Sequence, residues 1–285
     1  MKILVLGASG LLGNTFLQFF KKNALKKNLE VFFTFRKKKN NENLFVFDVH
    51  NKTTYKNIKK LRPDFVINCI GAIKPAINEK SANSIISALE VNSKLPGNLL
   101  DIFPKAKIIH FNTDCVFSGK RGDYTEDDTH DFNDIYGLTK SLGEIKSSRL
   151  MNLRCSIIGV EKKSAKSLVS WFLNIKEKKL QGFTNHAWNG LTTLALVQIT
   201  YAIITKKLFK PGLFHIVPKN RISKYSLLKL LNNKYFGGKK SIKAIKHKHT
   251  INRTLATKNS SFNRKLWKLS SHGEIKSIPQ MIKEM

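Results

Sequence analysis

The chain has 285 residues, of which 41% are hydrophobic and 10% aromatic. This composition excludes a disordered or fibrous protein, and the length supports a large core without a disulfide or metal. The net charge of +32 predicts long-range attraction for anions. No basic helix with interleaved aromatics organises that charge, however, so we expect no specific nucleic-acid partner.

Apolar runs bounded by turn residues alternate with helical stretches, a pattern typical of a parallel sheet with crossover helices. Strands are expected at Lys2–Leu6, Val31–Phe35, Leu44–Phe47, Phe65–Asn68, Lys107–Asn112 and Leu153–Ile158. Helices are expected at Asn14–Lys26, Lys56–Leu61, Ala82–Phe103 and Ile135–Arg149. Pro96 predicts a kink or break in the third of these helices.

The pattern changes after Gly159. There we expect an amphipathic helix, an irregular segment, a second helix and a strand, at Ala165–Lys178, Gln181–Gly190, Thr193–Lys206 and Gly212–Val217. The predicted fold class is therefore α/β, with a Rossmann-type doubly wound parallel sheet and a smaller C-terminal substrate-binding lobe. The expected NAD(P)-binding domain comprises residues 1–159 with 191–218, and the expected lobe comprises 160–190 with 219–285.

The apolar start of the chain breaks at Gly7 without a signal-peptide cleavage site. No later run reaches the ~20 apolar residues that a membrane-spanning helix needs. The three cysteines are far apart and lack metal-ligand spacing, which favours core packing in a reducing compartment. We therefore expect a cytoplasmic protein without a membrane partner.

A glycine-rich turn joins the first strand to the first helix. It comprises Gly7, Ala8, Ser9, Gly10, Leu11, Leu12 and Gly13. Glycines in this position allow a tight turn and the close approach of a pyrophosphate to the helix N-terminus. The G-x-x-G-x-x-G spacing differs from the usual dinucleotide fingerprint by one residue, and a plain strand-to-helix turn is the alternative. The order of strand, glycines and helix favours a dinucleotide site.

Basic residues end the second predicted strand, at Arg36 followed by Lys37, Lys38 and Lys39. A guanidinium in this place suits the 2′-phosphate of NADP, whereas an acid would favour NAD. We therefore expect NADPH as cofactor, with NADH as the alternative and solvated background charge as the simpler explanation. Asp48 and Val49 are placed to meet the adenine edge, although a capping role suits Asp48 equally well.

Tyr136 and Lys140 lie four residues apart, so they share one face of a helix. A phenol has a pKa near ~10 and exchanges protons more easily beside a cation, which Lys140 would supply. The Thr113 hydroxyl would hold a substrate carbonyl while Tyr136 donates the proton. An exposed helical pair is the common alternative. Position after the fifth strand of a glycine-motif domain favours the catalytic interpretation.

Five segments together resemble the extended short-chain dehydrogenases, in particular the dTDP-4-dehydrorhamnose reductase-like, or sugar-nucleotide-binding, branch. They are Gly7–Gly13, Asn68–Gly71, Thr113–Gly119, Tyr124–Asp128 and Tyr136–Lys140. The resemblance implies a catalytic triad of Thr113, Tyr136 and Lys140, with Lys140 also holding the nicotinamide ribose. It further implies that Cys69, Ile70 and Gly71 run beside the cofactor and that Asn92 lies behind the site. Asn112 departs from the serine usual in this branch.

Substrate contacts are expected from Thr113 and Asp114, and from residues in the stretch where such folds build a substrate pocket: Phe183, Asn185, Trp188 and Arg253. Trp171 serves the pocket or the core equally well, and Arg253 offers a fork-shaped donor for a diphosphate.

His247 and His249 are interpreted as surface residues. The acids between Asp123 and Asp134 lack metal-ligand spacing, so we expect no metal and a loop that caps the next helix.

The resemblance implies reduction of a keto group on a nucleotide-linked deoxysugar, for surface polysaccharide synthesis. A nucleotide-sugar epimerase or dehydratase of the same superfamily is one alternative. A non-catalytic, NADP-binding regulatory subunit is another, because one fold can serve several roles. A nucleotide sugar is the expected partner, and a homodimer is left open.

Overall fold

The computed structural model describes residues 1–23, 28–37, 44–161 and 167–285. The end of the predicted helix Asn14–Lys26, the cations Lys38 and Lys39, and the start of Ala165–Lys178 fall outside these ranges. The chain forms two compact units. Unit 1 comprises Met1–Val116, Phe132–Leu153 and Phe209–Leu213, and unit 2 comprises Phe117–Asp131, Arg154–Leu208 and Phe214–Met285. The boundaries of these units differ from those of the expected domains, and the expected division into two domains stays a prediction.

A seven-stranded sheet has the order β11-β6-β5-β4-β1-β2-β3. In chain order its strands are β1 (Lys2–Leu6), β2 (Glu30–Phe35), β3 (Leu44–Val46), β4 (Phe65–Asn68), β5 (Lys107–Asn112), β6 (Leu150–Arg154) and β11 (Gly212–His215). The β3-β2-β1-β4-β5 pairings are parallel. The chain winds outward from β1 in both directions, which confirms the predicted Rossmann-type α/β class and places a topological switch point between β1 and β4.

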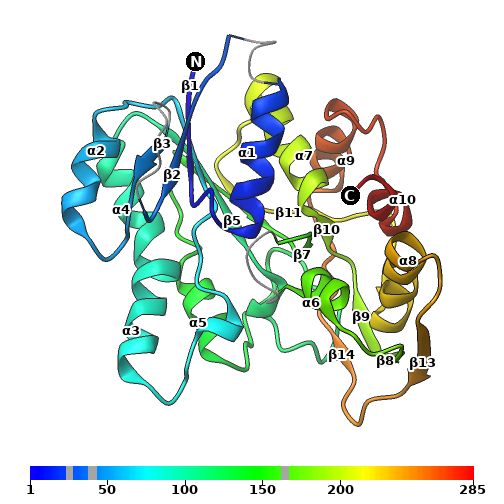
Figure 1. Ribbon diagram of the computed structural model, residues 1–285. Coiled ribbons are helices and arrows are strands. Elements are labelled where there is room, and N and C mark those ends of the chain that lie inside the picture. The colour runs from blue at the N-terminus through cyan, green and yellow to red at the C-terminus, as the bar shows by residue number, and fades with distance from the viewer. Residues whose placement is uncertain (24–27, 38–43, 162–166) are drawn as a thin grey trace. The chain divides into compact units, whose positions relative to one another are not determined.

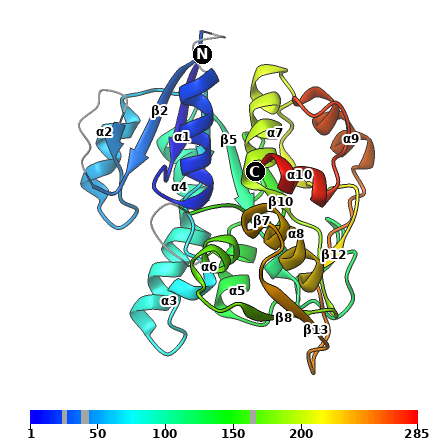
Figure 2. The same cartoon turned by 45° about the vertical axis from the view of Figure 1, so that its right-hand side comes forward.

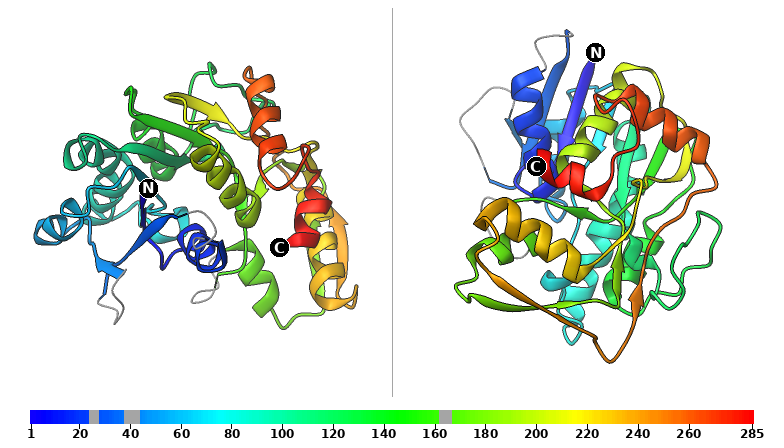
Figure 3. Two further views of the ribbon diagram at one scale, coloured as in Figure 1. Left: turned by 90° about the horizontal axis from the view of Figure 1, so that it is seen from above. Right: turned by 90° about the vertical axis from the view of Figure 1, so that its right-hand side faces the viewer.

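The strands of unit 1 are apolar on both faces because helices cover both. On one face, Leu4 and Phe32 pack in a cluster with Ile58 of α2 (Tyr55–Lys59) and Leu99 of α4 (Leu95–Ile102). On the other face, Phe16 of α1 (Leu11–Asn23) lies 6.0 Å, between ring centroids, from Phe111 of β5. Figures 1 and 3 show α1 and α4 on opposite sides of these strands. This layering leaves the carboxyl ends of the strands for function.

The predicted helix Ala82–Phe103 is divided into three parts. These are α3 (Ala82–Leu89), a π-helical turn (Glu90–Lys94) and α4, in whose first turn Pro96 lies. The π turn ends two residues before Pro96, which cannot donate a backbone hydrogen bond. The predicted interruption is therefore confirmed.

The helix expected at Ile135–Arg149 is shorter than predicted, and α5 comprises only Ile135–Leu142. A Cβ on the next residue, Gly143, would lie 2.0 Å from the Asn92 carbonyl oxygen. Only a glycine permits this close approach of α5 to the π turn. The prediction of a continuous helix was wrong because apolar spacing does not report such contacts.

The strand expected at Leu153–Ile158 is two strands. The chain leaves the large sheet after β6, and β7 (Ile157–Ile158) pairs with β10 (Leu191–Thr192) in unit 2. The segment expected to be irregular, Gln181–Gly190, contains most of β8 (Lys179–Phe183) and all of β9 (His186–Trp188). Both expectations were wrong, since local apolar runs do not reveal which distant strand they pair with.

Unit 2 also contains helices α6 (Leu168–Asn174), α7 (Thr193–Thr205), α8 (Lys224–Phe236), α9 (Ser260–Leu269) and α10 (Ile278–Glu284). Its other strands are β12 (Ile222–Ser223), β13 (Ser241–Ile245) and β14 (Ile251–Asn252). β13 pairs with β8 in parallel, and α8 runs beside this pair (Figure 2). Within the described ranges no helix has the length and apolar character to cross a membrane.

Candidate active site

The glycine turn is held by β2. The Gly7 N–H donates to the Thr34 hydroxyl at 3.0 Å and the Ala8 N–H to the Thr34 carbonyl at 2.9 Å. Gly7 has a φ of +80°, and a Cβ on Gly13 would lie 2.2 Å from the Gly7 carbonyl oxygen. Gly7 and Gly13 are therefore required by the turn itself.

Gly10 is not required in this way. Among the described residues, the nearest atom to a Cβ there would be the Gly7 carbonyl oxygen, at 3.5 Å, which is an ordinary contact. Ser9 and Gly10 are exposed where α1 begins, and the first amides of a helix lack intrahelical acceptors. This open backbone fits the close approach of a pyrophosphate. Leu12 is buried in the core, so only its backbone is suited to contact a ligand.

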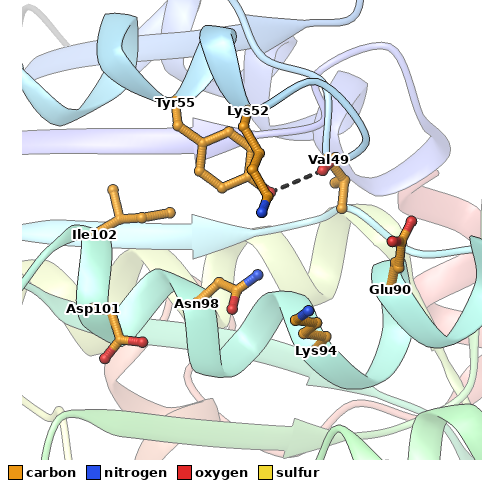
Figure 4. A pocket seen from close by; sticks show the side chains of 8 residues that line it. All are labelled: Val49, Lys52, Tyr55, Glu90, Lys94, Asn98, Asp101 and Ile102. Carbon is orange, nitrogen blue, oxygen red and sulfur yellow. Dashed lines mark hydrogen bonds between the residues drawn. The ribbon is translucent and has the colours of Figure 1, made fainter.

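Arg36 is exposed immediately after β2, as is Lys37. The Asp48 carboxylate accepts the His50 N–H at 3.0 Å within a turn, and the next helical turn is capped by Asn51 instead, so the helix-capping alternative for Asp48 was wrong. Val49 borders a hollow of about 330 Å³ and its carbonyl accepts the Tyr55 hydroxyl at 2.9 Å (Figure 4). The hollow is lined by Val49, Lys52, Tyr55, Glu90, Lys94, Asn98, Asp101 and Ile102. Cofactor contacts by Arg36, Asp48 and Val49 stay predictions.

The segment Cys69–Gly71 after β4 packs directly on the glycine turn. The nearest atom to a Cβ on Gly7 would be Cγ1 of Ile70, at 2.8 Å. The buried Asn92 amide holds the next residue, Ala72, by accepting its N–H at 2.9 Å and donating to its carbonyl at 3.0 Å. Asn92 also donates to the Thr139 hydroxyl at 3.0 Å. It thereby connects the loop after β4 to α5.

Thr113 and Tyr136 are brought together by the end of β5 and the first turn of α5. That turn begins at Asp134, whose carboxylate accepts the Gly137 N–H at 2.7 Å, as a helix cap does. The expected capping acid is thus present. The Thr113 hydroxyl donates to the Asp114 carboxylate at 3.1 Å and accepts the Cys115 N–H at 3.2 Å.

Burial raises the pKa of Tyr136 well above its ordinary value, and the nearby Cys115 thiol raises it further, while a hydrogen bond with Thr113 opposes the shift. The shift is opposite in sign to the lowering expected from Lys140. A raised pKa keeps the phenol protonated at neutral pH, which is the state that a proton donor needs. Cys115, expected in the core, is half-buried beside this phenol.

The Lys140 ammonium is almost fully buried and donates to the Phe111 carbonyl at 2.8 Å. Asn112 supports both ends of this arrangement. Its amide donates to the Lys140 carbonyl at 3.0 Å and accepts the Thr113 N–H at 2.9 Å. The departure from serine therefore gives one side chain that fixes the backbones of two members of the predicted triad.

The four residues expected to contact substrate from the C-terminal lobe all lie in unit 2. The Asn185 amide is engaged with the His247 backbone, donating to its carbonyl at 2.8 Å and accepting its N–H at 2.9 Å. The Phe183 ring lies 4.9 Å from the His247 ring. Trp188 is buried and donates to the Ser156 hydroxyl at 2.9 Å. Arg253 donates through Nε to the Phe117 carbonyl at 2.8 Å. Their roles in substrate binding stay predictions.

Unit 2 also holds a polar network around a buried arginine, which the sequence did not indicate. Arg154 is fully buried and lies 2.7 Å from ring nitrogens of both His215 and His130. Glu126 accepts the His215 N–H at 3.0 Å and the Thr257 hydroxyl at 2.5 Å. Isolated charges in a basic sequence give no signal of burial, so only the fold brings these residues together. Among the described residues no group of three or more His, Cys, Asp or Glu side chains is arranged to hold a metal ion.

The sheet order and the glycine turn are those of the extended short-chain dehydrogenase/reductases, a class of NAD(P)-dependent oxidoreductases, and the catalytic roles of Thr113, Tyr136 and Lys140 stay predictions. The model of the family described as RmlD substrate binding domain matches residues 1–285. The chain belongs to this family, which confirms the relationship inferred from the sequence motifs. No curated protein matches the chain.

Solved structures with the same fold cover almost the whole chain. A dTDP-4-dehydrorhamnose reductase from Clostridium acetobutylicum has 22% identity and a TM-score of 0.77, with 100% of this chain and 98% of that chain covered. A dTDP-4-dehydrorhamnose reductase from Bacillus anthracis in complex with NADP has 17% identity and a TM-score of 0.78, with 99% and 97% covered. The Helicobacter pylori ADP-L-glycero-D-manno-heptose-6-epimerase has 17% identity and a TM-score of 0.77, with 99% and 94% covered.

Proposed function

We propose that the protein reduces a keto group on a nucleotide-linked deoxysugar with NADPH, in the manner of a dTDP-4-dehydrorhamnose reductase. The open glycine turn and exposed Arg36 support the cofactor, and the reductases of similar fold support the substrate class. The proposal includes a cytoplasmic location and a role in surface polysaccharide synthesis. Contacts of Phe183, Asn185, Trp188 and Arg253 with the nucleotide sugar are part of it.

The observation that carries the proposal is the interaction of Thr113 with a half-buried Tyr136, whose raised pKa keeps the phenol protonated. A bound nicotinamide cofactor supplies the hydride. Thr113 orients the substrate carbonyl, and Tyr136 donates the proton to its oxygen as negative charge develops there. Lys140, fixed through Phe111 and Asn112, holds the nicotinamide ribose and places a positive charge that favours proton loss from the phenol.

Replacing Tyr136 with Phe tests this assignment. The variant keeps the ring and its packing but loses the proton donor, so turnover of a nucleotide-sugar panel is expected to fall by about 10²–10⁴-fold. The melting temperature and the NADPH dissociation constant are expected to change little. Wild-type protein that binds NADPH but reduces no sugar in the panel, together with an unaltered Y136F variant, would favour the regulatory alternative.

An epimerase is the second candidate, favoured by the fold shared with the heptose epimerase. An epimerase returns the hydride to its substrate and retains the cofactor. A reductase releases oxidised cofactor once per turnover. Stoichiometric oxidation of NADPH during sugar conversion supports the reductase, and conversion with no net oxidation supports the epimerase.

A further inference from the structure

Two buried polar residues face each other across adjacent strands beneath the candidate site. Asn68 is the last residue of β4 and His110 its register partner on β5. They are 1% and 0% exposed. Nδ2 of Asn68 lies 3.1 Å from Nδ1 of His110. A polar pair at this depth requires an explanation beyond packing, because apolar side chains occupy most of the surrounding sheet.

The hydrogen bonds fix how this pair is oriented. The Ile70 N–H donates to Oδ1 of Asn68 at 3.1 Å, which identifies the oxygen of that amide. The amide nitrogen therefore faces His110, whose Nδ1 must accept, so the proton lies on Nε2. Burial, with the Lys140 charge adding, holds the pKa of His110 well below its ordinary value and keeps the ring neutral. Nε2 has no hydrogen-bond partner among the described residues.

The pair reaches the glycine turn through Ile70. The Ile70 backbone nitrogen lies 3.2 Å, and its Cγ1 2.8 Å, from where a Cβ on Gly7 would stand. A shift of Ile70 would therefore displace the turn, or open a gap beside it. On the other side, His110 immediately precedes Phe111 and Asn112, which hold Lys140. One buried contact thus joins the strand that leads into Thr113 to the loop that packs on Gly7.

We propose that His110 is a positioning residue for the cofactor site: its Nδ1 orients Asn68, Asn68 holds the Ile70 N–H, and Ile70 sets the glycine turn. His110 itself touches neither cofactor nor substrate. The inference rests on the proposed cofactor site, but not on the sugar that is reduced. An apolar ring in place of His110 would fill the same space, so the imidazole is explained by the acceptor that it provides.

Two substitutions of His110 separate positioning from packing. His110→Phe keeps the ring volume and removes the acceptor, so the dissociation constant for NADPH is expected to rise on the order of tenfold. His110→Asn places an amide oxygen near the former Nδ1 and leaves a smaller side chain. It is expected to lower the melting temperature while retaining near wild-type affinity. His110→Phe is thus expected to lose mainly affinity for NADPH, whereas His110→Asn is expected to lose mainly stability.

Asn68→Ala removes the other member of the pair and is expected to weaken NADPH binding as His110→Phe does. The double variant is expected to bind NADPH no more weakly than the weaker-binding of the two single variants. Asn152→Ala is the matched control, because Asn152 is a buried amide on β6 that donates to the Ile145 carbonyl. It is expected to lose stability and keep its affinity. NADPH fluorescence titration and thermal unfolding give both quantities.

The inference is overturned if His110→Phe and Asn68→Ala bind NADPH as tightly as wild type, or if affinity follows stability across all four variants. Wild-type protein that binds no nicotinamide cofactor overturns it together with the proposed function. Wild-type protein that binds NADPH but reduces no sugar contradicts the proposed function alone, because the affinity measurements remain decisive for His110.

Discussion

Single residues in the candidate site are constrained to very different degrees. Gly7 and Gly13 cannot change without altering the turn, whereas Gly10 is open and Arg36 is exposed. The constrained positions report how the chain folds. The unconstrained positions are accessible to a ligand, and Arg36 is the one proposed to contact the 2′-phosphate of NADPH.

Replacing Arg36 with Asp is expected to weaken NADPH binding much more than NADH binding. The change removes a charge-assisted hydrogen bond to the 2′-phosphate of NADPH and places a carboxylate against that phosphate. The 2′-hydroxyl of NADH, in contrast, would donate a hydrogen bond to the new carboxylate. Dissociation constants for both cofactors, measured in each protein, give the ratio. Lys37→Asp is a neighbouring control with the same charge change. An equal loss in both variants would mean that only the general charge matters, not Arg36 itself.

Among the secondary-structure elements, α5 depends on one close contact. Gly143→Ala would place a methyl group against the Asn92 carbonyl, so the free energy of unfolding is expected to fall by about 1–3 kcal/mol. Gly97→Ala in α4 is the control, because its Cβ would meet nothing closer than Ile145, at 3.7 Å. It is expected to keep or raise stability through helix propensity. Urea unfolding measures both, and a Gly143→Ala variant as stable as Gly97→Ala would contradict the contact.

The sequence predicted elements well where one strong local pattern coincided with the observed structure. β1, β4 and β5 have the predicted bounds, and α7 ends one residue before its prediction. Prediction failed where distant contacts decide: α5 stops where Gly143 meets Asn92, and β7 leaves the sheet to pair with β10. For the site, motifs indicated the glycine turn and the triad residues. The role of Asn112 and the Asn68–His110 pair depends on which strands become neighbours, which no short motif records.

For the whole molecule, acid should be destabilising in two successive pH ranges. Burial and the Arg154 charge lower the pKa of His215 from 6.5 to about 4. Burial raises the pKa of Glu126, but hydrogen bonds from Thr257, His215 and Lys258 outweigh it and lower that pKa from 4.5 to about 2. In both ranges the unfolded chain binds more protons than the folded chain, so stability falls as pH falls. His215 contributes between about 6.5 and 4, and Glu126 between about 4.5 and 2.

Glu126→Gln is therefore expected to lower stability at neutral pH and to flatten its decline between pH 4.5 and 2. Urea unfolding across a pH series measures this slope. Asp127→Asn is the control, since that carboxylate is mostly exposed and forms an ion pair with Lys258. A Glu126→Gln variant with the wild-type slope below pH 4.5 would show that the acid response originates elsewhere.

The hydrogen bonds of Glu126 join residues that lie far apart in the sequence, which affects when this region can fold during synthesis. Glu126 bonds to His215, Thr257 and Lys258, which follow it by 89, 131 and 132 residues. At about 5–20 residues per second, a ribosome takes roughly 7–26 seconds to add the last of them. Unit 1 likewise remains incomplete until residues Phe209–Leu213 have been added. A nascent chain that already contains Thr113, Tyr136 and Lys140 therefore still lacks the residues that anchor Glu126.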